Sequence, residues 1–234
     1  MRDYLLQERY RDQNAEKKTN FIKIAKVGEI THLSGFGISN GVVKKLAKDY
    51  FRKGLPFDQV LTDCNRMFRE AKYTEEHVFV FNLIELYKNS VIEELFEYAN
   101  EWIDYIDHWV SSDHLGINAM RYYPVQNHLD QIRTWSSSDN FWRRRQSMTF
   151  VLKHLNREDV RNCAIMNITD LLDDRNYYVR KAIPWVLRIC SKYDPKLIYE
   201  YLVEHISQLN KTELREASKK LEEKEKLIEL YLNK

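Results

Sequence analysis

The sequence predicts an all-α fold in which pairs of helices repeat along the chain. Glycine and proline are scarce, with 6 Gly and 4 Pro among 234 residues, whereas β-sandwiches and barrels need both residues at their many tight turns. Apolar residues recur at the helical spacing almost everywhere. An Asn-x-aromatic tripeptide also returns, at residues 100–102, 140–142 and 176–178. Together these observations favour stacked pairs of helices.

The expected elements follow one another from the amino terminus. A charged amphipathic helix is expected within residues 1–28, and the glycine-containing stretch 35–41 follows it as a loop. Capping and turn residues such as Gly54-Leu55-Pro56 and Asp194-Pro195 separate the later helices. The pattern predicts these helices at about 42–53, 57–71, 75–88, 91–111, 125–135, 141–155, 158–172, 177–191, 195–208 and 212–232.

The repeated tripeptide suggests the architecture. Its three copies begin 40 and 36 residues apart, and the last two match further because Arg144 and Arg145 correspond to Arg180 and Lys181. Two helices in roughly 40 residues is the spacing of HEAT and armadillo repeats, whose units stack into a curved solenoid with a concave face. We expect one such domain over residues 1–234, ending in a charged helix at 212–234. A compact bundle with coincidental matches is the alternative.

Positive charge is concentrated in one part of the chain. Residues 141–192 hold 11 Lys and Arg against 5 Asp and Glu, although the net charge of the whole chain is only +2. Aromatic residues such as Trp142, Tyr177 and Trp185 are interleaved with these charges. A basic, aromatic concave face of this kind suits a phosphate backbone. The alternative is a solvated pair of helices that happens to be basic.

Several classes of protein are disfavoured. No stretch approaches 18 apolar residues and no apolar signal region follows the N-terminal residues, so we expect a cytoplasmic protein without a membrane partner. The three cysteines are widely spaced, the seven histidines show no ligand spacing, and no phosphate-binding loop is present. We therefore expect no metal, no cofactor and no redox or phosphoryl-transfer chemistry, and we expect a monomer.

Two residues interrupt the apolar pattern. Arg145 lies on the otherwise apolar stripe of the helix at 141–155, so it must reach the stripe's edge, find a partner or face a charged ligand. Asp107 flanks two aromatic and aliphatic stripes of the helix at 91–111. Such surroundings can tune a carboxylate for catalysis, although a solvated aspartate beside an aromatic stripe is the more ordinary arrangement.

Four segments together resemble the DNA alkylation repair family of HEAT-like-repeat DNA glycosylases, the AlkD-like family. The resemblance covers about residues 30–220. The segments are the early turn Phe36-Gly37-Ile38, the tryptophan–aspartate segment at 100–107, the W-x-x-S-x-N-x-W-x-x-R-like segment at 135–145, and the helix at 177–188.

The resemblance implies an activity and a set of site residues. Family members hydrolyse the N-glycosidic bond of cationic N3- or N7-alkylated purines in duplex DNA. A carboxylate, here Asp107, stabilises the positive sugar that forms as the bond breaks. We therefore expect the catalytic residues to be Asp107, Trp185 and Trp102. The expected DNA-binding residues are Arg145, Arg144, Trp142, Arg180 and Lys181.

The sequence departs from the family pattern at two positions. Ile103 stands where the family has a second active-site tryptophan, and Pro184 stands where a glycine is common. These departures keep two alternatives open besides the glycosylase. One is an inactive or altered paralogue that binds damaged double-stranded DNA without base excision. The other is a protein-binding helical-repeat scaffold.

Overall fold

A computed structural model describes residues 5, 33, 35, 37–90 and 92–233. The helix expected within residues 1–28, apart from Leu5, and Phe36 of the early turn lie outside the described residues. Within them the fold contains 12 α-helices, four shorter helical turns and no strand, so the all-α prediction is confirmed. The contacts divide the chain into two compact units, residues 1–123 and 124–234, a division that the sequence did not reveal.

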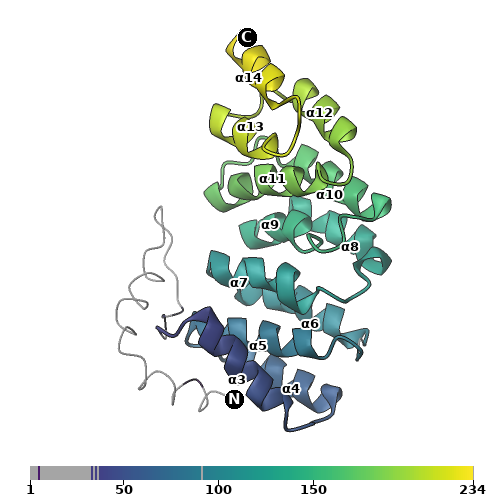
Figure 1. Ribbon diagram of the computed structural model, residues 1–234. Helices are drawn as coiled ribbons and strands as arrows, with labels where there is room; N and C mark the ends of the chain where they lie inside the picture. Colours follow the sequence, from purple (N-terminus) through teal and green to yellow (C-terminus); the bar gives the residue numbers. More distant parts are fainter. Residues whose placement is uncertain (1–4, 6–32, 34, 36, 91, 234) are drawn as a thin grey trace. The chain divides into compact units, whose positions relative to one another are not determined.

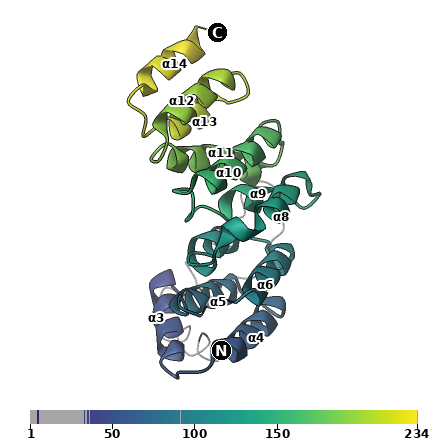
Figure 2. The same ribbon diagram turned by 90° about the vertical axis from the view of Figure 1, so that its right-hand side faces the viewer.

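The first unit is built around one fully buried helix. Its α-helices are α3 (Asn40–Phe51), α4 (Phe57–Arg69), α5 (Thr74–Leu86), α6 (Glu94–Trp102) and α7 (Trp109–His114). Every residue of α5 from Thr74 to Ile84 is buried, because the helix contacts α3, α4 and α7. In Figure 2 it lies between α3 on one side and α4 and α6 on the other.

The two carboxylates buried with α5 are paired with backbone N–H groups. The Glu76 carboxylate accepts the backbone N–H groups of Lys72 (2.7 Å) and Tyr73 (3.0 Å) and so caps the helix. Glu75 accepts the backbone N–H of Gly37 at 2.8 Å. Gly37 has φ of 86°, a conformation that favours glycine. These bonds allow two carboxylates to lie in an apolar core.

The helix expected at 91–111 is interrupted, which corrects that prediction. Helix α6 ends at Trp102, a 3₁₀ turn spans Ile103–Tyr105, and Ile106 is extended, with φ −73° and ψ 126°. His108 then caps α7, because its Nδ1 accepts the backbone N–H of Val110 at 3.2 Å. The apolar spacing continues through the break, so periodicity alone did not reveal it.

The second unit stacks helices in two columns. Its helices are α8 (Leu129–Thr134), α9 (Phe141–Thr149), α10 (Glu158–Asp170), α11 (Tyr177–Cys190), α12 (Pro195–Glu204), α13 (Lys211–Ala217) and α14 (Lys224–Leu232). Helices α9, α11 and α13 form one column in Figure 1, and α8, α10 and α12 form the other. The single helix expected at 212–232 is two helices, α13 and α14, joined by residues 218–223.

Asparagine caps repeat along the first of these columns. Asn140, Asn176 and Asn210 each accept backbone N–H groups at the start of α9, α11 and α13, at 2.9–3.3 Å. The tripeptides at 140 and 176 are thus equivalent helix starts, and Asn210 is a third that lacks the aromatic residue. Asn100 lies inside α6 and not at the start of a helix, so its match with the other two is coincidental.

An arginine from each preceding helix reaches the next cap. Arg144 on α9 pairs with Asp174 at 2.6 Å, and Asp174 accepts the backbone N–H of Asn176 at 2.7 Å. Arg180 on α11 pairs with Glu213 at 2.5 Å, and Glu213 accepts the backbone N–H of Asn210 at 3.0 Å. Each arginine therefore fixes its own helix to the first turn of the next one.

The Arg180–Glu213 pair is expected to contribute strongly to stability. Glu213→Ala removes both the ion pair and the reciprocal cap of α13, so the free energy of unfolding should fall by about 2–4 kcal/mol. Urea unfolding monitored by circular dichroism measures this change. Glu200→Ala, which breaks the exposed Lys196–Glu200 pair, should change stability little. Equal effects of the two variants would contradict this role of Glu213.

A buried histidine should make the protein less stable in acid. Burial lowers the pKa of His77 to about 3, and its ring nitrogens contact Ser111 Oγ (3.1 Å) and the Phe68 carbonyl (3.2 Å). Unfolding frees the ring to bind a proton below about pH 6.5, so stability should be lost as the pH falls from there, by up to about 1.4 kcal/mol per pH unit.

The test compares urea unfolding of the wild type and His77→Gln between pH 7.5 and 4.5. The variant should lose less stability than the wild type over this range. Burial also lowers the pKa of His108 and His114, so part of the pH dependence should remain. Parallel profiles for the two proteins would contradict the role of His77.

Candidate catalytic carboxylate and nucleic-acid interface

Asp107 lies in the first unit, in the short connection between the 3₁₀ turn and α7. Its Oδ2 accepts the backbone N–H of Leu33 at 2.8 Å, which fixes the carboxylate from a distant part of the chain. Its Oδ1 is buried and accepts no hydrogen bond from the residues that the structure describes. The side chain is thus a half-buried carboxylate whose orientation is fixed by its bond to Leu33.

The residue next to Asp107 is a buried histidine. His108 is only 2% exposed, and this burial lowers its pKa even though Asp107 and Asp113 act in the opposite direction. Its Nδ1 accepts the hydrogen bond that caps α7, so the ring is neutral and carries its proton on Nε2. A neutral imidazole supplies no cation to pair with Asp107.

Trp102, one of the expected catalytic residues, is part of the core. The side chain is fully buried, and its indole N–H donates to Asn65 Oδ1 at 2.9 Å. The ring also stacks on Phe68, with centroids 5.0 Å apart. Ile103 is fully buried as well. Neither residue presents a side chain that can contact a sugar or a base.

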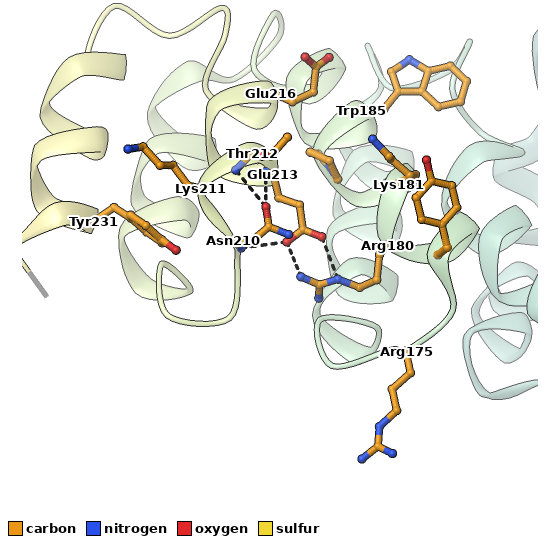
Figure 3. Close-up of a pocket in the computed structure, with 12 residues that line it drawn as sticks. Arg175, Arg180, Lys181, Trp185, Asn210, Lys211, Thr212, Glu213, Glu216 and Tyr231 are labelled. Carbon is orange, nitrogen blue, oxygen red and sulfur yellow. Dashed lines mark hydrogen bonds and ion pairs between the residues drawn. The ribbon is translucent and has the colours of Figure 1, made fainter. Parts of the chain in front are cut away.

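Trp185 lies in the second unit, at a groove between α11 and α13. Tyr177, Lys181 and Trp185 follow one another at four-residue spacing on one side of α11, and α11 continues through Pro184 without a break. The groove has a volume of about 1060 Å³. Figure 3 shows Lys181 and Trp185 on one side of this α11–α13 groove and Lys211 and Tyr231 on the other.

Arg145 and Trp142, two of the expected DNA-binding residues, lie in the interior. Each is only 4% exposed. Arg145 Nη1 donates to the backbone carbonyl of Tyr178, and its guanidinium carbon lies 5.8 Å from the centroid of the Trp185 ring. Trp142 packs against Tyr178 at 5.1 Å between centroids. Arg145 therefore supports Trp185 from within the protein.

The other expected DNA-binding residues divide into two kinds. Arg144 and Arg180 are engaged by Asp174 and Glu213, as described above, so phosphate would have to displace a carboxylate. Lys181 is exposed, with its Nζ 5.6 Å from the centroid of the Tyr177 ring. Of the five expected DNA-binding residues, Lys181 is the one that has an exposed charge and forms no ion pair with a carboxylate of the described residues.

The groove also contains residues that the sequence analysis missed. Arg175, Lys211 and Tyr231 line it, but none belongs to the motifs that carry the family resemblance. Lys211 directly follows Asn210, the third asparagine cap. If the repeat of asparagine caps had been followed to this third copy in the sequence, Lys211 would have been identified. No comparable signal marks Tyr231.

Neither a metal site nor a reactive thiol is found in the part of the chain that the structure describes. It contains no group of three or more metal-ligating side chains and no helix long and apolar enough to cross a membrane. The three cysteines are free and buried. Burial raises the pKa of Cys163 to about 11 and of Cys190 to about 12, and it raises that of Cys64 further. The thiols are therefore poor nucleophiles.

Comparison with known proteins gives one family and two similar structures. The family model described as DNA alkylation repair enzyme matches residues 5–221. A predicted DNA alkylation repair enzyme from Enterococcus faecalis is 21% identical, with a TM-score of 0.71 over 90% of this chain and 95% of that chain. AlkD2 from Streptococcus mutans is 18% identical, with a TM-score of 0.57 over 93% of this chain and 99% of that chain. A search of curated proteins found no match.

Proposed function

The chain belongs to the family of DNA alkylation repair enzymes, and we propose that it is a glycosylase acting on cationic N3- or N7-alkylated purines in duplex DNA. Family membership and the shared helical fold support the broader role in DNA repair. The observation that carries the finer proposal is Asp107, a carboxylate fixed through Oδ2 while Oδ1 accepts no hydrogen bond among the described residues.

The proposed reaction needs little acid catalysis. When the bond between the sugar C1′ and the purine nitrogen breaks, its electron pair neutralises the positive base, which is already a good leaving group. Positive charge then develops on the sugar, and water adds to C1′ and loses a proton. A preoriented, partly desolvated carboxylate stabilises this positive charge more effectively than bulk water does.

The second unit supplies features suited to holding DNA. Lys181 is exposed beside Tyr177, and Trp185 is supported from below by the buried guanidinium of Arg145. An exposed cation beside an aromatic ring suits a phosphate next to a sugar or base. In this proposal Asp107 is the catalytic residue, Trp185 contacts the nucleotide, and Arg145 is a positioning residue for Trp185.

Removal of the Asp107 charge should abolish base release. Asp107→Asn keeps the size of the side chain and an oxygen that can accept the Leu33 N–H, but it removes the negative charge. Release of 7-methylguanine or 3-methyladenine from methylated duplex DNA should fall by about 100-fold or more. Asp104→Asn, an exposed position three residues earlier, serves as the control. No base release above background by the wild type would refute the proposed activity.

A repair protein that binds DNA without excising bases is the second candidate function. It is favoured by the burial of both Trp102 and Ile103, because neither side chain can supply the aromatic contact that the family resemblance places beside the aspartate. In this case duplex DNA should bind in a salt-dependent manner, and no base should be released.

The second candidate is tested at Lys181. Lys181→Glu should weaken duplex binding by about tenfold at low salt, whereas Asp107→Asn should leave affinity unchanged. Fluorescence anisotropy over a salt series, together with the base-release assay, separates the two functions. Arg145→Glu is unsuitable because it would place an unpaired charge in the interior. No DNA binding even at low salt would contradict both functions and favour a protein-binding scaffold.

A further inference from the structure

We propose that a DNA strand binds along the α11–α13 groove, with phosphates on Lys181 and Lys211 and with Tyr231 of α14 packed against a sugar or base. This inference rests on the proposed role in DNA binding and deepens it, because it assigns new contact residues. It does not depend on base excision.

The charges of the groove leave a positive surplus. Its two carboxylates are already paired, Glu213 with Arg180 at 2.5 Å and Glu216 with Arg188 at 2.7 Å. Lys181, Lys211 and Arg175 also line the groove, and none of them forms an ion pair within the described part of the chain. Because neighbouring arginines neutralise the two carboxylates, the electrostatic field in the groove comes from the remaining cations. This positive field attracts a polyanion.

Aromatic side chains accompany these cations on both sides. Trp185 comes from α11, and Tyr231 comes from α14 on the opposite side (Figure 3). Tyr177 of α11 also lines the groove. Pockets for small molecules are lined mainly by apolar groups, whereas proteins that bind nucleic-acid strands combine backbone-tracking cations with aromatic surfaces for stacking. The composition of this groove fits the second description.

Tyr231 is held in place by the packing of α14. Leu227 is fully buried, and α14 contacts α13. Tyr231 follows Leu227 by one helical turn, so it lies on the same side of α14. Helix α14 begins at Lys224, beyond residues 5–221 that the family model matches. Tyr231 therefore lies outside the part of the chain that the family model matches.

Fluorescence anisotropy with a labelled duplex at several salt concentrations tests the groove in the full chain. Lys211→Glu should weaken binding by about tenfold and lower the salt slope by about 1. Tyr231→Ala should weaken binding by about fivefold or more with an unchanged slope, and Tyr231→Phe should bind like the wild type. Lys226→Glu is the matched control, because Lys226 is exposed on α14 but does not line the groove.

The outcomes separate this inference from the proposed activity. A glutamate at position 211, the first residue of α13, suits the helix dipole, so Lys211→Glu should remain folded. Binding by Lys211→Glu and Tyr231→Ala equal to that of Lys226→Glu would overturn the groove. Weakened binding of these variants, with no base release by the wild type, would support the groove and refute the glycosylase.

Discussion

The ion pair between an arginine and the carboxylate that caps the next helix organises the second unit. The arrangement occurs twice, from α9 to α11 and from α11 to α13, and each time it joins three groups: a guanidinium, a carboxylate and the first turn of a helix. Each carboxylate accepts a backbone N–H as well as the arginine. Such a link fixes the spacing of successive helices. It also fixes the rotation of each helix about its own axis, because the arginine must reach a cap that is formed at only one end of the next helix.

This use of arginine determines which residues can meet a ligand. Arg145 and Lys181 occupy equivalent places in the repeat, yet Arg145 is buried and Lys181 is exposed. Helix α11 has 14 residues and contacts α9, whereas α13, which contacts α11, has only 7. Arg145 donates to the Tyr178 carbonyl of α11, whereas Lys181 lines the groove beside Trp185.

Much of the fold followed from the sequence because it is encoded locally. Helical periodicity and capping residues predicted most helices within a few residues. The break at Ile106 was missed because Trp102, Ile106 and Trp109 keep helical spacing across it. The Asn100 match was misleading because a tripeptide carries no information about its position within a helix. The division at residue 123 depends on contacts between residues about 30 positions apart. The same is true of whether an arginine is buried or exposed. Periodicity carries no information about such contacts.

The site was predicted unevenly for the same reason. The family motifs led to Asp107 and Trp185, whose roles stay predictions. The motifs also led to Trp102, Trp142 and Arg145, which belong to the interior. A motif records which residues accompany a function, and it includes those that hold the site together as well as those that touch the substrate. Burial separates the two kinds, and burial is a property of the folded chain.

The hydrogen bond from Leu33 to Asp107 has an evolutionary consequence. Donor and acceptor are 74 residues apart in sequence, so this one carboxylate joins two distant parts of the first unit in addition to any chemistry it performs. Position 107 therefore has an architectural role that does not depend on the proposed catalysis. A descendant protein that no longer excised bases would still need the aspartate for this structural contact. The aspartate could therefore be kept after the activity was lost.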